Sequence, residues 1–187
     1  MYNVSVDKRE FFAAKLAAGT AKTASKMAAW WPRHAHASMD YLAMGADGFL
    51  GDQEKTSRDM VLSIAREWEV KVPSASRGRA GISSGLMAEH AALECELVDV
   101  VSLGEGDRVE RVVEKLFANA KAHTPRYAHA LRGFPEARFS ELLREHASLF
   151  LDAVTARVDR STAGVTRCAR HMEENAVALA TITAEWF

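Results

Sequence analysis

FSELLREHASLFLDAV, residues 139–154, decides the fold, because the chain contains two relatives of this stretch. GLMAEHAALECELV occupies residues 85–98, and WWPRHAHASMDYL occupies residues 30–42. The three stretches align on His34, His90 and His146, which follow one another at a constant step of 56 residues. Each of these histidines is followed by an alanine. Self-similarity at one fixed step of this size is typical of a repeated supersecondary unit.

A second set of positions keeps the same step. Asn119 and Asn175 are separated by the same interval as His90 and His146, and Ser63 stands in the equivalent place of the first unit. Gly48 and Gly104, in two expected turns, are separated by this interval as well. The sequence therefore predicts three copies of one unit, each a helix, a turn and a returning helix.

Helical periodicity places the arms of these units, and Gly, Ser and Pro mark the breaks between them. Neither strict alternation nor Asn-Gly turns occur, so we expect no strands. The predicted fold is all-α, with three tandem antiparallel helical hairpins forming a six-helix bundle. The paired arms are 30–44 with 56–70, 86–103 with 109–131, and 138–158 with 166–186. The expected turns are 45–52, 104–107 and 159–164, and the expected connecting loops are 72–85 and 132–137.

Two parts are expected in the chain: an N-terminal arm, 1–29, and a repeat domain, 30–187, whose hairpins span 30–72, 86–131 and 138–187. The arm carries a predicted short helix after Asp7, with a glutamate three residues later as in a capping box. One interpretation is a solvated helix that docks on the bundle. The other is a partner-binding arm in which Phe11, Phe12 and Lys15 make the contacts.

Composition narrows the function classes. The chain has 187 residues, 48% hydrophobic and 26% charged, with a formal net charge of −1. This balance is typical of a globular domain and gives no reason to expect nucleic acid. No apolar run reaches the roughly 20 residues of a membrane span. Cys95 and Cys168 lack metal-ligand spacing and are expected to be buried thiols in a reducing compartment. We expect a cytoplasmic protein, or one inside an assembled particle.

The repeated histidines lie within apolar helical stripes, so each imidazole needs a partner in the core. The midpoint between His90 and Asn119 falls in the turn after residue 103, and residues equidistant from a hairpin turn face each other. The favoured interpretation is therefore a structural hydrogen-bond layer that fixes hairpin register. Its pairs are His34 with Ser63, His90 with Asn119, and His146 with Asn175.

The alternative is that His34, His90 and His146 converge on a pseudo-threefold axis and hold a metal. Asp40, Glu96 and Asp152, each six residues after a histidine, are the acids considered as further ligands. Six residues span about 240° around a helix, which places acid and histidine on different faces. This reading predicts histidines of different hairpins pointing at one another, whereas the first reading predicts pairs within hairpins.

Several short motifs resemble an uncharacterised family of small all-helical proteins found in bacilli and in large DNA viruses. That family has a W-x-x-H opening, later L-L-x-x-H and N-A motifs. The matching positions here are Trp31-x-x-His34, Leu86-Met87-x-x-His90, Asn119-Ala120, Leu142-Leu143-x-x-His146 and the terminal Trp186-Phe187. The resemblance covers about residues 30–187 and implies an all-helical fold without an established activity.

No nucleophile elbow, phosphate-binding loop or dinucleotide fingerprint is present in the sequence. We therefore expect a non-enzymatic scaffold that binds other proteins or itself, without a cofactor, as a subunit of a larger assembly such as a virion or other particle. The alternative function is a metal-binding bundle or metal-dependent enzyme that uses the histidine layer.

Overall fold

The computed structural model describes residues 28–45, 52–75, 85–131 and 133–185. Regular structure in these ranges is entirely helical, so the expected all-α class is confirmed. The first described helix spans 28–45. The others are α2 (Asp52–Ala75), α3 (Leu86–Ser102), α4 (Gly106–Ala130), α5 (Glu136–Val158) and α6 (Thr162–Ala184).

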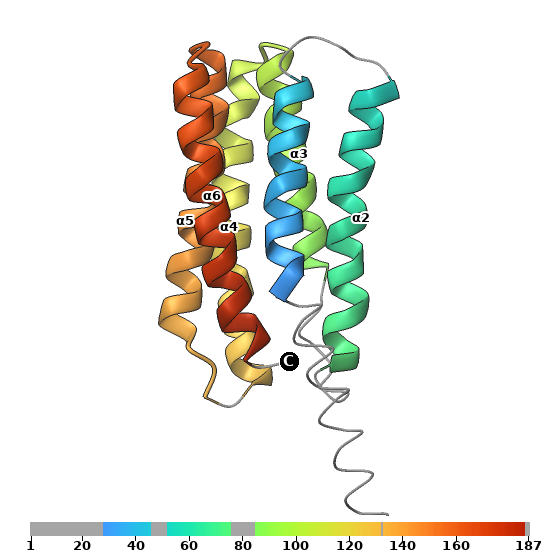
Figure 1. The fold of residues 1–187 in the computed structure, drawn as a ribbon, viewed down its shortest axis with the longest axis vertical. Helices are drawn as coiled ribbons and strands as arrows, with labels where there is room; N and C mark the ends of the chain where they lie inside the picture. The colour runs from blue at the N-terminus through green and yellow to red at the C-terminus, as the bar shows by residue number, and fades with distance from the viewer. Residues whose placement is uncertain (1–27, 46–51, 76–84, 132, 186–187) are drawn as a thin grey trace, which may run out of the picture.

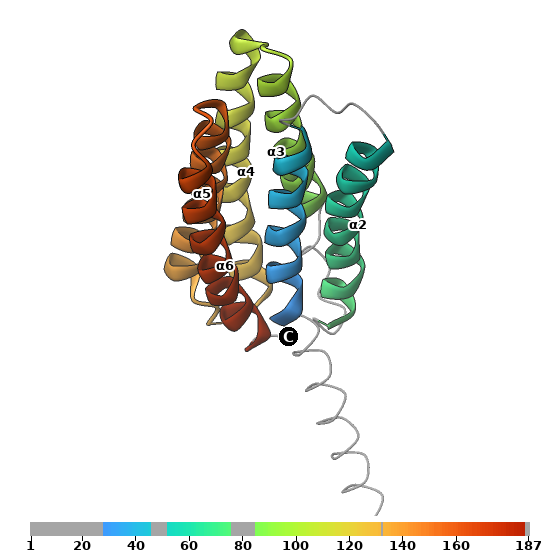
Figure 2. The same cartoon turned by 45° about the horizontal axis from the view of Figure 1, so that its top comes forward.

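The helices stand side by side as an up-and-down bundle (Figures 1 and 2). α4 packs against both α3 and α5, while α2 packs against α3 and α6 packs against α5. Helix 28–45, α3 and α5 run in the same direction, and each is followed by a helix that returns (Figure 1). Equivalent positions on these three parallel helices therefore lie at the same height in the bundle.

Burial of large apolar side chains stabilises this arrangement. Trp31, Trp68, Phe139 and Phe150 are fully buried and join one hydrophobic core. Burying one side chain of this size contributes about 1.5–3 kcal/mol to the stability of the fold, relative to leaving it exposed. Polar groups at this core are consequently few, and each of them requires an explanation.

The turn between α3 and α4 is short and locally encoded. Gly104 has a φ of 69°, a left-handed conformation that glycine adopts without steric cost. The amide of Glu105 donates to the carbonyl of Val100 at 2.8 Å, which closes the end of α3. At the next hairpin, Ser161 caps α6 by accepting a 3.1 Å hydrogen bond from the amide of Gly164.

Several predicted boundaries were wrong by a few residues. Gly45 is helical rather than the start of a turn, and α2 continues to Ala75, beyond the predicted loop start at residue 72. Residues 162–164 form the first turn of α6, because the Ser161 cap lets the helix begin immediately. Gly106 and Glu136 likewise begin α4 and α5 inside a predicted turn and a predicted connector. The N-terminal helix and the arm residues Phe11, Phe12 and Lys15 lie outside the described residues.

Candidate metal centre

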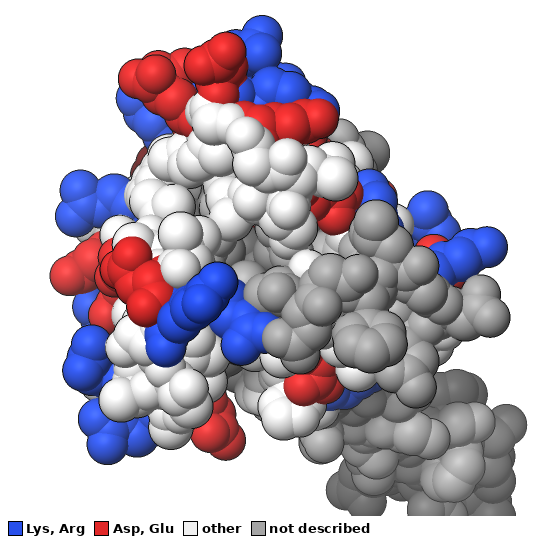
Figure 3. All heavy atoms as spheres, turned by 90° about the horizontal axis from the view of Figure 1, so that it is seen from above, with Lys and Arg blue, Asp and Glu red and all other residues white. Residues whose placement is uncertain are grey.

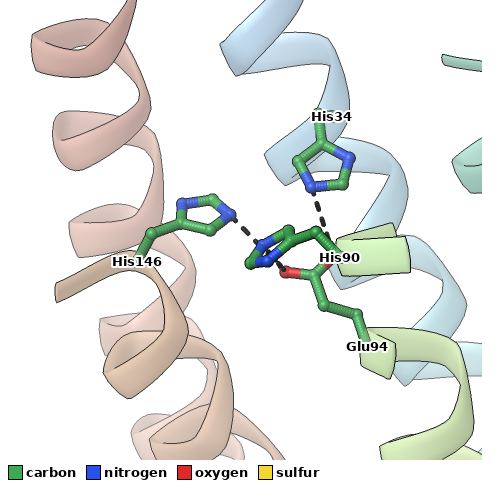
Figure 4. Close-up of side chains that lie close together, drawn as sticks. All are labelled: His34, His90, Glu94 and His146. Carbon is green, nitrogen blue, oxygen red and sulfur yellow. Dashed lines mark ion pairs between the residues drawn. The ribbon is translucent and has the colours of Figure 1, made fainter. Parts of the chain in front are cut away.

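Three histidine rings meet at the centre of the bundle. His34 comes from helix 28–45, His90 from α3 and His146 from α5. Their ring centroids are separated by 5.8, 5.7 and 5.7 Å, so they form a nearly equilateral triangle. All three side chains are 0% exposed. Histidines of different hairpins thus point at one another, as the metal alternative predicted (Figure 4).

Glu94, on α3, adds a carboxylate to this triangle. Its oxygens lie 3.2 Å from Nε2 of His34, 3.4 Å from Nε2 of His90 and 3.5 Å from Nε2 of His146. One ligand atom from each of the four residues lies within 4.8 Å of every other. Tetrahedral zinc with bonds of about 2.0–2.1 Å holds ligand atoms roughly 3.3–3.4 Å apart. The nitrogen-to-oxygen separations are close to this value, with Oε2 of Glu94 beside His34 and Oε1 beside His90 and His146.

The atoms that face the centre lack hydrogen bonds. In the part of the chain that the structure describes, Nε2 of all three histidines and Oε1 of Glu94 are buried without a partner of hydrogen-bond geometry, although each histidine nitrogen lies within ion-pair distance of a Glu94 oxygen. Buried polar atoms in native proteins are nearly always paired, so four adjacent exceptions need a physical cause.

Two asparagines fix the tautomer of their histidines. Nδ1 of His90 lies 3.2 Å from Oδ1 of Asn119, and Nδ1 of His146 lies 3.2 Å from Oδ1 of Asn175. Nδ2 of Asn119 donates to the carbonyl of Leu86, and Nδ2 of Asn175 donates to that of Leu142, both at 3.0 Å. These donations orient each amide so that its oxygen faces the imidazole.

Since an amide oxygen only accepts, Nδ1 of His90 and of His146 must carry the proton. In a neutral imidazole, Nε2 then presents a lone pair to Oε1 of Glu94, which is also an acceptor. Two facing acceptors repel unless a cation lies between them, either a metal ion or the second proton of an imidazolium. The two predicted hydrogen bonds are present, and outer partners of metal sites fix the tautomer of ligand histidines in the same way.

The first hairpin departs from this pattern. Ser63 is exposed, so the predicted pair with His34 is wrong. The buried face of α2 explains why, because it is displaced by one residue relative to the repeat: its buried residues precede their α4 counterparts by 55 positions instead of 56. Val61, Ile64, Ala65 and Trp68 correspond to Leu116, Asn119, Ala120 and His123. An isoleucine therefore replaces the asparagine, and Nδ1 of His34 has no partner among the described residues. The ring of Trp30 stacks on His34 at 5.0 Å instead.

Ser38 orients the carboxylate of Glu94. Its hydroxyl donates to Oε2 of Glu94 at 2.7 Å, which leaves Oε1 to face His90 and His146. Ser38, Glu94 and Phe150 follow their histidines by four residues, so the three parallel helices supply one carboxylate between them.

The charge states favour ligation. Burial opposes ionisation of Glu94, but its contacts with His34, His90 and His146 outweigh burial and hold its pKa well below the usual range. Burial lowers the pKa of His146 despite the neighbouring carboxylate. An ionised carboxylate beside a neutral imidazole is the protonation state in which both bind metal.

The acids considered from the sequence lie elsewhere. Asp40 and Asp152 are exposed, and Glu96 forms an ion pair with Arg108 at 2.9 Å. Glu94 was missed, although residues four apart share a helix face and the pattern His90-x-x-x-Glu94 was visible. The sequence feature that could have identified Glu94 as a site residue is a carboxylate within the apolar face of its helix.

A fourth histidine lies beside this cluster. The ring of His123, on α4, is 6.1 Å from that of His90 and perpendicular to it. Burial lowers the pKa of His123 to about 3. It is therefore neutral at physiological pH, and its Nε2 has no hydrogen-bond partner within the described ranges.

The outer surface contrasts with this centre. Seen from above, basic and acidic side chains are interspersed on the described part of the surface, with uncharged atoms between them (Figure 3). Within the described ranges, no helix has the length and apolar character to cross a bilayer.

No family model, no curated protein and no solved structure matches the chain.

Proposed function

We propose that the protein is a metal-binding helical bundle whose centre holds one divalent transition-metal ion through His34, His90, His146 and Glu94. The observation that supports this proposal best is a set of four convergent atoms, three imidazole Nε2 and one carboxylate oxygen, that are buried without a hydrogen-bond partner among the described residues. A cation between them converts a repulsive contact into a coordination shell. Three imidazole nitrogens and one carboxylate oxygen suit zinc, and also iron(II), cobalt(II) and nickel(II).

The constant repeat step gives this proposal a structural logic. Parallel helices that carry a histidine at the same height deliver three imidazoles to one axis without any contribution from loops. The supporting contacts recur at this step as well: Asn119 reaches Glu89 at 2.8 Å, and Asn175 reaches Glu145 at 3.0 Å. We infer that the hairpins derive from one repeated unit and that the metal layer lies on their common axis.

The test is metal content measured on matched variants. Elemental analysis of the purified protein should find about one transition-metal ion per chain, as expected for one set of four ligands. His90→Gln and Glu94→Gln should lose the ion, since each removes one of the four ligands. His36→Gln and Glu96→Gln are matched controls on helix 28–45 and α3, because His36 is exposed and Glu96 pairs with Arg108. Both controls should retain the ion.

The proposal fails if the wild-type protein contains no stoichiometric metal and takes none up after dialysis against zinc, iron(II), cobalt(II) or nickel(II). It also fails if the controls lose metal as readily as the ligand variants, since binding would then lie elsewhere on the protein.

The scaffold role expected from the sequence stays a prediction. The arm residues that would bind a partner lie outside the described residues, and the contacts within the described helices bear on the centre rather than on a partner.

A further inference from the structure

Among the described residues, two more buried polar atoms beside the histidine layer lack a hydrogen-bond partner. They are Nε1 of Trp31 and Nε2 of His123. Trp31 is 0% exposed and His123 is 1% exposed. The second ring nitrogen of His123 is accounted for, because the ring makes a hydrogen bond with the backbone of Leu86. Buried donors and acceptors that lack a protein partner are usually hydrogen-bonded to a bound molecule such as water.

Both side chains lie on the face of the layer away from Glu94. Trp31 precedes His34 by one helical turn, whereas Glu94 follows His90 by one turn, on helices that run in the same direction (Figure 1). His123 is bonded to Leu86, which precedes His90 by one turn. The carboxylate and the two unpaired groups therefore lie on opposite sides of the three imidazoles.

The two side chains also contact all three ligand rings. The ring of Trp31 lies 5.7 Å from that of His146 and 6.2 Å from that of His34, and the ring of His123 lies 6.1 Å from that of His90. An indole Nε1 only donates a hydrogen bond, while an imidazole Nε2 also accepts one. A ligand placed between them needs a lone pair for Trp31, and an O–H group satisfies His123. Water and hydroxide meet both requirements.

We propose that the metal carries a water or hydroxide ligand on its face away from Glu94, held by Trp31 Nε1 and His123 Nε2. This inference rests on the metal site of the proposed function. It makes the centre one with an exchangeable position, as in catalytic metal sites, rather than a closed structural one. Trp31 and His123 are then positioning residues for the metal-bound oxygen.

The test uses protein loaded with cobalt(II), whose visible absorption strengthens as coordination falls from five ligands to four. Wild type should show the weaker, five-coordinate spectrum. Trp31→Phe and His123→Leu should strengthen it, through loss of the oxygen ligand, while the bound cobalt stays at one ion per chain. Leucine is a reasonable replacement, since the residue in the equivalent place of the third unit is the fully buried Leu179. His123→Gln, which retains a polar group near Nε2, should restore the wild-type spectrum in part.

Thr124→Val is the matched control. Thr124 follows His123 on α4, about 100° around the helix from it, and its side-chain oxygen is also buried without a hydrogen-bond partner among the described residues. Its substitution should leave the spectrum unchanged. A crystal structure of the cobalt-loaded wild type provides a second measurement that does not depend on any variant folding. It should contain a non-protein oxygen bound to the metal and within hydrogen-bond distance of Trp31 Nε1 and His123 Nε2.

The outcomes separate the two proposals. Failure to bind cobalt would overturn the metal site and this inference together. Cobalt bound by four protein atoms only, with a spectrum that Trp31→Phe and His123→Leu leave unchanged, would overturn this inference alone.

Discussion

At the residue scale, the pairs of His90 with Asn119 and of His146 with Asn175 have two roles at once. Each pair fixes the register of its hairpin, because the hydrogen bond joins side chains from two antiparallel helices. Each also fixes the imidazole tautomer, which directs a lone pair to the centre. The sequence presented a structural layer and a metal site as alternatives, whereas the same hydrogen bonds support both.

Removing an asparagine should therefore weaken metal binding and stability together. Asn175→Ala leaves Nδ1–H of His146 buried and unpaired, at a cost of about 1–3 kcal/mol. Loss of such an outer partner typically lowers metal affinity by about 10–100-fold. Competition with a metal-binding dye should measure the affinity, and urea denaturation the stability.

Ser63→Ala is the control for this substitution. Ser63 occupies the equivalent place in the repeat but is exposed, so neither quantity should change. Unchanged metal affinity in Asn175→Ala would show that tautomer control by the asparagine is unimportant.

Individual residues also show how much of the site could be predicted from the sequence. Hairpin symmetry was sufficient to pair His90 with Asn119, because a short turn leaves little freedom in register. It was insufficient for His34, because the buried stripe of α2 is displaced by one residue and places Ile64 where Ser63 was expected. Glu94 was missed because the apolar face of a helix is normally expected to hold core residues, and a carboxylate is costly to bury there. The cost of burying Glu94 is offset by His90 on the same helix and by His34, Ser38 and His146 from other helices.

At the scale of elements, α5 and α6 approach each other closely at Gly164. A Cβ added to Gly164 would lie 2.9 Å from Cβ of Ala156 on α5 and 2.9 Å from Oγ of Ser161, the cap of α6. Both distances are shorter than normal van der Waals contact. Glycine at this position therefore allows the two helices to approach and the cap to form.

Gly164→Ala should destabilise the bundle by about 1–3 kcal/mol, the usual cost of overpacking, even though alanine is the better helix former. Gly106→Ala is the control, since Gly106 begins α4 and an added Cβ meets nothing within 4 Å. Its stability should be unchanged or slightly higher. Equal effects of the two substitutions on the urea midpoint would contradict the close packing of α5 on α6.

At the scale of the whole molecule, the buried histidines link stability to pH. The folded protein lowers the pKa of His123 to about 3 and also lowers that of His146. Below pH 6.5, the ordinary value, the unfolded chain therefore binds protons that the folded bundle does not. The linkage relation then requires the free energy of unfolding to fall as pH decreases.

The metal-free protein should accordingly lose up to about 1.4 kcal/mol per pH unit for each such histidine below pH 6.5. Urea denaturation between pH 7.5 and 5 measures this slope. His123→Leu should reduce it, while His36→Gln, at an exposed position, should leave it unchanged. A stability that is constant over this range would show that the buried histidines are already protonated in the folded state.

The central claim is that a metal ion joins the three hairpins at their common axis, and anomalous X-ray diffraction tests it most directly. Crystals grown with zinc, measured above and below the zinc absorption edge, should show one strong anomalous peak inside the bundle. The peak should lie about 2.0–2.2 Å from Nε2 of His34, His90 and His146 and from a carboxylate oxygen of Glu94. The absence of a peak there, or peaks confined to surface groups such as His36 and Asp40, would contradict the claim.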